Sequence, residues 1–128
     1  INAACVAHRT PLVEGSAIRF SGQVSAFNLA QPESACYACL FPPEQEVEDV
    51  VCATMGVFAP LVGLIGSLQA AEALKLLLGL PSRLQSHLLL VDGLAMRFDE
   101  IGVQRDSHCT VCGKPHDLPS PTRASATL

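Results

Sequence analysis

Two C-x-x-C pairs, Cys36–Cys39 and Cys109–Cys112, constrain this chain more than any other feature of its sequence. Each pair brings two sulfur atoms within reach of one ion, and Gly113 after the second pair permits the tight turn of a knuckle. Four thiolates around one tetrahedral zinc ion form a closed, structural site rather than a catalytic one. Because residues 40–108 separate the pairs, the site is expected to join two remote parts of one fold rather than to build a zinc finger.

Two disulfides or a redox dithiol would use the same four residues. Disulfides are disfavoured because no secretory signal is visible and a chain that is 49% hydrophobic can bury a core without cross-links. A thioredoxin-type pair should open a helix after a strand, and neither pair is expected to do so. His108 and His116 flank the second pair and could replace a sulfur, although plain surface positions are the simpler interpretation.

Length, hydropathy and charge limit the classes of protein to which this chain can belong. A chain of 128 residues forms one ordinary domain, and its mean hydropathy of +0.36 argues against intrinsic disorder. With a formal net charge of −4, we expect no nucleic-acid partner and no membrane surface as partner. The chain starts at Ile1 within an apparent helix end, so we expect a fragment of a longer, cytoplasmic polypeptide.

Hydrophobic periodicity indicates an α/β fold. We expect a helix end at residues 1–8, then strands at 11–20 and 23–29 joined by a turn at Ser21-Gly22. A proline-containing, acidic loop covers residues 30–49. A long helix over 56–78 follows, with Pro60 in its first turn and Gly79 after its end. Strands at 87–91 and 96–103 complete a mixed or antiparallel sheet, and residues 114–128 are expected to be a disordered tail or linker.

The long helix is apolar nearly all round, so we expect it to be buried. Small residues recur every four positions along one face, which lets another backbone approach closely: Ala59, Gly63, Ser67 and Ala71. Residues 50–71 carry no charge and are long enough in principle to cross a bilayer. Three glycines, Pro60 and the continuation of the helix through Glu72 and Lys75 favour a core helix instead.

The remaining cysteines, Cys5 and Cys52, stand alone. Cys52 precedes the long helix, where amide dipoles favour a thiolate, so it could be a nucleophile or acyl acceptor. A buried apolar cysteine is the alternative, and sequence chemistry slightly favours it. Cys5 lies in an alanine-rich helix end and is assigned to the core.

Several short motifs occur in an order that is specific for one family. They are Asn2-Ala3-Ala4-Cys5, Pro11-Leu12-Val13-x-Gly15-Ser16-Ala17-Ile18-Arg19, Gly22-Gln23-Val24, Cys36-Tyr37-x-Cys39-Leu40, Gly56-Val57-x-x-Pro60-Leu61-Val62-Gly63, Gly66-Ser67-Leu68-Gln69-Ala70-x-Glu72-Ala73-x-Lys75 and Cys109-x-x-Cys112-Gly113. In these motifs the chain resembles the C-terminal half of the MoeB/ThiF/HesA family, bacterial relatives of the ubiquitin-activating enzymes. The resemblance covers about residues 1–113.

The resemblance implies the C-terminal half of a Rossmann-like activating-enzyme fold over residues 1–113, carrying the zinc, a carrier-docking surface and homodimer contacts. It implies an ATP-dependent adenylyltransferase that activates the C-terminal glycine of a ubiquitin-like sulfur-carrier protein, for sulfur transfer in molybdopterin, thiamine or related biosynthesis. By position, Cys36, Cys39, Cys109 and Cys112 match the family's zinc ligands. Cys52 matches a loop cysteine that carries an acyl group in some members. The acidic residues 44–49 are either a solvated connection or a crossover segment under which the carrier's tail passes.

The family's nucleotide loop precedes the stretch that resembles this chain, and no G-x-G-x-x-G motif is present here. ATP and Mg are therefore expected only in the full-length protein, and we expect the isolated chain to be inactive. The alternative is a non-catalytic, zinc-stabilised module that binds a ubiquitin-like partner. A thiol redox protein is a third interpretation, and it predicts rapid alkylation of the native thiols.

Overall fold

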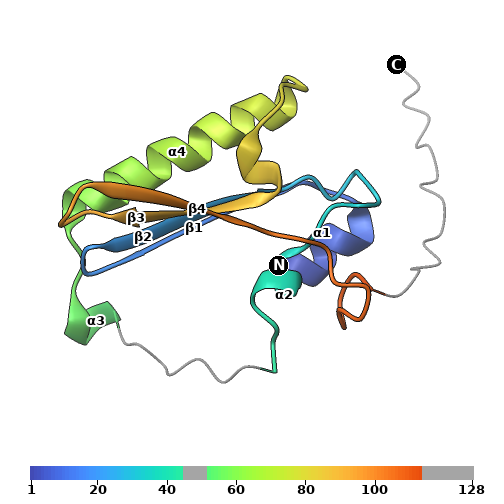
Figure 1. Ribbon diagram of the computed structural model, residues 1–128, viewed down its shortest axis with the longest axis horizontal. Coiled ribbons are helices and arrows are strands. Elements are labelled where there is room, and N and C mark those ends of the chain that lie inside the picture. Colours follow the sequence, from blue (N-terminus) through green and yellow to red (C-terminus); the bar gives the residue numbers. More distant parts are fainter. Residues whose placement is uncertain (45–51, 114–128) are drawn as a thin grey trace, which may run out of the picture.

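The computed structural model describes residues 1–44 and 52–113. Its elements are, in chain order, α1 (Asn2–His8), β1 (Leu12–Ile18), β2 (Ser21–Phe27), α2 (Tyr37–Leu40), α3 (Cys52–Met55), α4 (Ala59–Leu77), the 3₁₀ helix η1 (Arg83–Gln85), β3 (His87–Asp92) and β4 (Arg97–Gly102) (Figure 1). The expected elements are all present, with ends that differ by one to three residues. The predicted tail and residues 45–49 of the acidic loop lie outside the described residues.

The four strands form one sheet in the order β1-β2-β3-β4, and all three pairings are antiparallel. Of the two sheet types expected, the antiparallel one is therefore found in the described part of the chain. Parallel pairing is limited there to an isolated bridge between Arg19 and Val57. Among the described strands only β2 pairs with β1, which places β1 at an edge of the sheet.

The turn between β1 and β2 lies at Arg19-Phe20, not at Ser21-Gly22 as the sequence predicted. Ser21 already pairs with Ile18, and Arg19 adopts a positive φ of 50°. The backbone N–H of Arg19 donates to Gly56, and Phe58 donates back to the carbonyl of Arg19. These bonds hold a non-glycine residue in the left-handed region, which explains why a rule based on glycine misplaced the turn.

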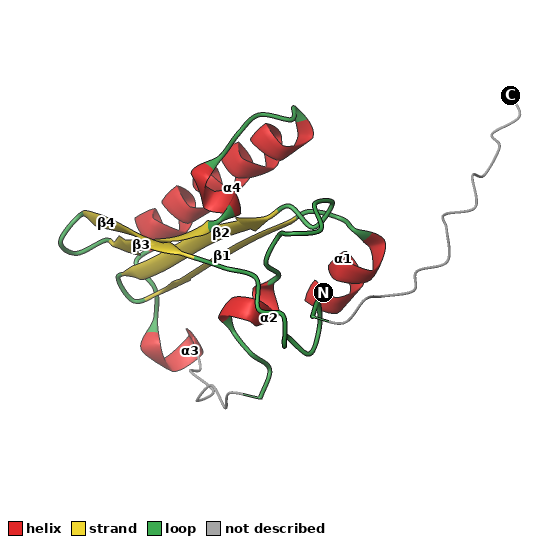
Figure 2. Ribbon diagram, turned by 45° about the vertical axis from the view of Figure 1, so that its right-hand side comes forward, coloured by secondary structure: helices red, strands yellow, loops and turns green. Residues whose placement is uncertain are grey.

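Helix α4 packs along one face of the sheet (Figure 2). Leu61 and Ile65 are 2% and 3% exposed and contact Val24 and Val91 of the central strands. The expectation of a buried helix therefore holds for the side that faces the sheet, whereas Val62, Leu74 and Leu77 are exposed. The sheet covers one side of the helix, and no other described element covers the rest. By length and composition α4 would also suffice to cross a membrane.

The other face of the sheet is partly covered by the segment that follows β2. Phe27 and Leu88 from the sheet form a second buried cluster with Ala35 and Val103. Tyr37, the first residue of α2, contacts Phe27 edge-on at a ring distance of 6.4 Å. This cluster fixes α2 at the end of the sheet where α1 also lies (Figures 1 and 2). Residues 103–113, which follow β4, reach the same end (Figure 1).

Candidate metal centre

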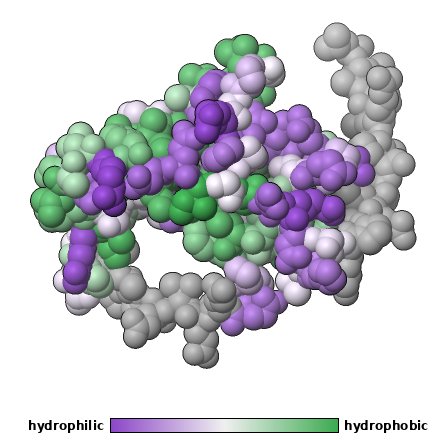
Figure 3. All heavy atoms as spheres, in the orientation of Figure 1, coloured by the Kyte–Doolittle hydropathy of each residue, from purple (hydrophilic) through white to green (hydrophobic). Residues whose placement is uncertain are grey.

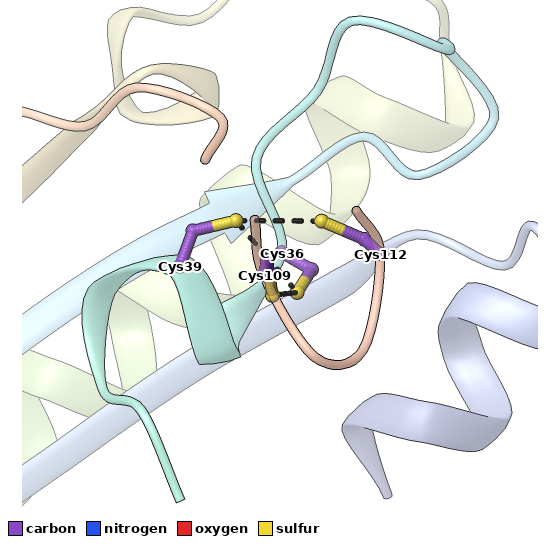
Figure 4. A group of neighbouring side chains, drawn as sticks. All are labelled: Cys36, Cys39, Cys109 and Cys112. Atoms are coloured by element: carbon purple, nitrogen blue, oxygen red, sulfur yellow. Dashed lines mark hydrogen bonds between the residues drawn. The ribbon is translucent and has the colours of Figure 1, made fainter. Parts of the chain in front are cut away.

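The two C-x-x-C pairs meet at this end of the molecule, as the sequence predicted (Figure 4). Cys36 is the N-cap residue of α2 and Cys39 lies within α2, so the helical turn places both sulfurs on one side. Cys109 and Cys112 lie in the turns that follow β4. The four Sγ atoms all lie within 4.8 Å of one another. Two segments far apart in the sequence therefore supply one compact cluster of sulfur atoms.

The sulfur separations fit a tetrahedral metal ion. Sγ of Cys39 lies 3.4 Å from that of Cys112 and 4.0 Å from that of Cys36, and the Cys36–Cys109 separation is 3.8 Å. Four sulfurs at about 2.3 Å from a central zinc are about 3.8 Å apart. A disulfide requires about 2.05 Å, and the five cysteines with described side chains are free. The arrangement can hold a metal ion, and it is not a pair of disulfides.

Backbone geometry explains the glycine after the second pair. The N–H of Gly113 donates to the carbonyl of Cys109 at 2.9 Å, closing the knuckle. A Cβ atom on residue 113 would lie 2.5 Å from the carbonyl oxygens of both Cys109 and Ser107. Arg105 adds a hydrogen bond of 2.7 Å from its guanidinium to the carbonyl of Cys112. Only a residue without a side chain fits the closed turn.

The electrostatic environment of the cluster disfavours four free thiolates. Burial raises the pKa of the Cys36 and Cys112 thiols, and neighbouring sulfurs raise that of Cys112 further. Burial opposes ionisation of Cys109 as well, but hydrogen bonds from the backbone amides of Cys112 and Val111 and from the Cys112 and Cys36 thiols together lower the pKa of that thiol. A divalent cation would supply the charge that makes four thiolates favourable in this buried place.

Asn2 occurs in one of the family motifs, but its contact with the cysteine cluster was not predicted from the sequence. The side-chain N–H of Asn2 donates to Sγ of Cys36 at 3.5 Å, and its carbonyl oxygen accepts from the backbone N–H of Tyr37 at 3.2 Å. The backbone N–H of Asp106 donates to Sγ of Cys39 at 3.5 Å. No local pattern could have identified Asn2, because its partners lie 34 and 35 residues away.

The other candidate residues lie away from the sulfurs or are not described. The His108 side chain is 93% exposed and its Nδ1 faces Asp106, so it does not complete the sulfur cluster. His116 lies outside the described residues. Cys52 is the first residue of α3, but its side chain lies outside the described part, so its role stays a prediction. Cys5 is half-buried on α1 rather than in the core.

Comparisons with protein families and with known proteins point to the same family. The ThiF family model matches residues 1–111. The sulfur carrier protein ThiS adenylyltransferase of Escherichia coli is 46% identical over 88% of this chain and 44% of its own length. The molybdopterin-synthase adenylyltransferase of the same organism is 40% identical over 89% and 45%. The chain thus spans less than half the length of these curated relatives.

A solved structure supports the fold. The crystal structure of Escherichia coli MccB with MccA-N7isoASN matches with a TM-score of 0.68 and 17% identity. The match covers 88% of this chain and 36% of the MccB chain. At this identity the likeness concerns the fold alone. The relatives at higher identity are named as adenylyltransferases that act on sulfur carriers or in molybdopterin synthesis.

Proposed function

Because the chain belongs to the ThiF family, we propose that it forms the C-terminal half of an ATP-dependent adenylyltransferase for a ubiquitin-like sulfur carrier. The observation that carries the proposal is the match of residues 1–111 to the family, together with relatives that share this activity in their names. The full-length protein would use ATP and Mg, held by the half that this chain does not include. Residues 1–113 would be the zinc-binding, carrier-docking and dimerisation part.

The chemistry of the proposed reaction follows from the substrate. A carboxylate is a poor electrophile, so the C-terminal glycine of the carrier attacks the α-phosphate of ATP and pyrophosphate leaves. The resulting acyl-adenylate carries AMP as a good leaving group, which a sulfur donor then displaces. Cys52 is the residue of this chain proposed as an acyl acceptor, by its position ahead of α4.

For the metal we propose zinc, bound by Cys36, Cys39, Cys109 and Cys112. Four cysteine ligands and no open position are typical of structural zinc. In this role the ion would join α2 to the segment after β4 and take no part in the reaction. Support comes from the sulfur spacing and from the closed knuckle at Gly113.

Exposed apolar residues support a role in assembly. They gather where the β1–β2 turn, the β3–β4 turn and the start of α4 meet, and Figure 3 shows hydrophobic colouring at that end. The patch consists of Phe20, Val57, Phe58, Val62, Leu94, Met96 and Phe98. The small-residue face of α4 is exposed too, which suits close packing against a second copy. Carrier docking and homodimer formation are therefore part of the proposal.

A chimera tests the activity. This chain would replace the matching C-terminal part of the Escherichia coli ThiS adenylyltransferase, to which it is 46% identical. We expect carrier-dependent exchange of labelled pyrophosphate into ATP by the chimera and none by the 128-residue chain alone. Exchange by the isolated chain would overturn the assignment of ATP binding to the absent half. A folded chimera that binds the carrier without exchange would favour the alternative, a non-catalytic module for a ubiquitin-like partner.

A further inference from the structure

Asn2 makes two contacts that link α1 to the cysteine cluster. Its carbonyl oxygen accepts from the N–H of Tyr37 at 3.2 Å, and its amide N–H donates to Sγ of Cys36 at 3.5 Å. Both partners lie at the start of α2, in the segment that supplies the first cysteine pair. One side chain therefore contacts both the backbone of that segment and one of its sulfurs.

The orientation of the Asn2 amide follows from helix capping. The first N–H groups of a helix lack partners within the helix, and α2 has Cys36 at its N-cap position with no side-chain capping bond of its own. The carbonyl oxygen of Asn2 meets the free N–H of Tyr37 instead. Because Tyr37 N–H can only donate, the oxygen of the amide must face it, and the NH₂ group is left to face the sulfur.

The apolar surroundings strengthen this link. Cys36 is 0% exposed, and Val6 of α1 packs against the same cluster of cysteines. The sulfur end of this hydrogen bond is buried and the Asn2 end is partly buried, so water competes with it less than at an exposed site. It also withdraws electron density from a thiolate, which stabilises the charge that metal binding requires.

We propose that Asn2 is a positioning residue of the metal centre, which orients Cys36 for the ion and couples α1 to metal binding. This rests on the proposed metal site but goes beyond it, since Asn2 is not a ligand. It has a consequence for the whole protein. The ion would then restrain α1 as well as the two segments that supply the cysteines.

Zinc affinity of the purified 128-residue chain tests the proposal. Asn2→Leu keeps the side-chain size and removes both hydrogen bonds, while Asn2→Asp keeps an acceptor for Tyr37 and removes the donor to Cys36. We expect both variants to bind zinc 10–100-fold more weakly in competition with a chromophoric chelator. Asn28→Leu is the matched control, because Asn28 is the other asparagine and bonds to Gln85 away from the cysteines. Its affinity should stay within twofold of the wild type.

Two further measurements separate positioning from a general loss of folding. With cobalt in place of zinc, Asn2→Asp and Asn2→Leu should shift the sulfur-to-metal charge-transfer band to lower energy, because a thiolate without its donor is richer in electrons. Hydrogen exchange of the α1 amides should rise in Asn2→Leu even with the metal bound. Unchanged affinity and an unshifted band in both variants would overturn the role of Asn2 alone. Failure of the wild-type chain to bind zinc or cobalt would overturn the metal site itself.

Discussion

The Sγ atoms of Cys39 and Cys112 lie 3.4 Å apart although 73 residues separate them in the sequence. Helix α4 and the strands β3 and β4 lie in that interval, so the contact closes a large loop of the chain. A metal ion at this point would restrain the ends of the loop, and it would do so only in the folded chain. Metal binding is therefore expected to contribute directly to folding stability.

Removal of the metal should destabilise the chain. We expect about one zinc per chain after purification, and a lower melting temperature after treatment with a strong chelator, because the ligands no longer share an ion. Cys39→Ser should have the same effect, since serine is a poor zinc ligand. Cys5→Ser is the control, because Cys5 does not belong to the cluster of four sulfurs. Elemental analysis with far less than one zinc per chain would contradict the assignment.

Metal should also protect the cysteines from alkylation. In the zinc-loaded chain we expect at most Cys5 and Cys52 to react with iodoacetamide, because bound thiolates are poor nucleophiles toward it. After chelation, the four clustered cysteines should react as well. Mass spectrometry of the alkylated peptides reads out each site. Rapid reaction of a C-x-x-C pair in the zinc-loaded protein would favour the thiol redox interpretation instead.

Gly113→Ala should weaken the second knuckle. The added methyl group would lie 2.5 Å from two backbone carbonyl oxygens, which cannot move aside as a flexible side chain would. We expect a loss of about 1–3 kcal/mol in the free energy of unfolding, together with weaker zinc binding. Gly66→Ala is the control: a Cβ there meets no atom within 4 Å, and alanine in a helix interior gains about 0.5–1 kcal/mol. Chemical denaturation of both variants with zinc bound gives the comparison.

Features encoded by short spacings were predicted well from the sequence. The C-x-x-C pairs, Pro60 in the first turn of α4 and Gly79 just after its end are local patterns, and the structure confirms all three, although α4 begins at Ala59 and not at residue 56. The role of Asn2 depends on contacts with distant residues, and no local pattern indicates them. The burial of α4 was overestimated because periodicity shows which residues are apolar, not which element covers them.

Ser82→Ala should destabilise the junction between α4 and η1. The Ser82 hydroxyl accepts from the N–H of Leu84 at 3.2 Å and donates to the carboxylate of Glu72, which is only 4% exposed and also pairs with Lys75. Loss of the hydroxyl leaves a buried carboxylate with one partner fewer and η1 without its cap. We expect a loss of about 1–3 kcal/mol in denaturation experiments. Ser86→Ala, at an exposed hydroxyl, should change stability by less than about 0.5 kcal/mol.

Glu14 should make the stability of the chain depend on pH. Its carboxyl lies on the edge strand β1, beside a cavity of about 520 Å³, and one of its oxygens is buried without a hydrogen-bond partner. Burial raises the pKa of Glu14, although the hydrogen bond from Gln23 opposes this. The folded chain therefore holds its proton to higher pH than the unfolded chain does. Between the ordinary pKa of 4.5 and the raised pKa in the folded chain, the unfolded state binds fewer protons than the folded state. The contribution of Glu14 to stability therefore falls as the pH rises through this range.

Glu14→Gln removes the buried charge and keeps an oxygen that can accept from Gln23. We expect the variant to be more stable than the wild type at pH 7, and the difference to vanish below pH 4.5, where the wild-type carboxyl is protonated in both states. Glu33→Gln, on the loop after β2, is the control for the loss of one negative charge. Urea unfolding at a series of pH values measures the difference in the free energy of unfolding. Because the wild type and both variants carry the same four cysteines, effects of pH on metal binding are common to all three and cancel in the comparison. A Glu14→Gln variant that is less stable than the wild type at pH 7 would show that the carboxylate has a stabilising partner in solution.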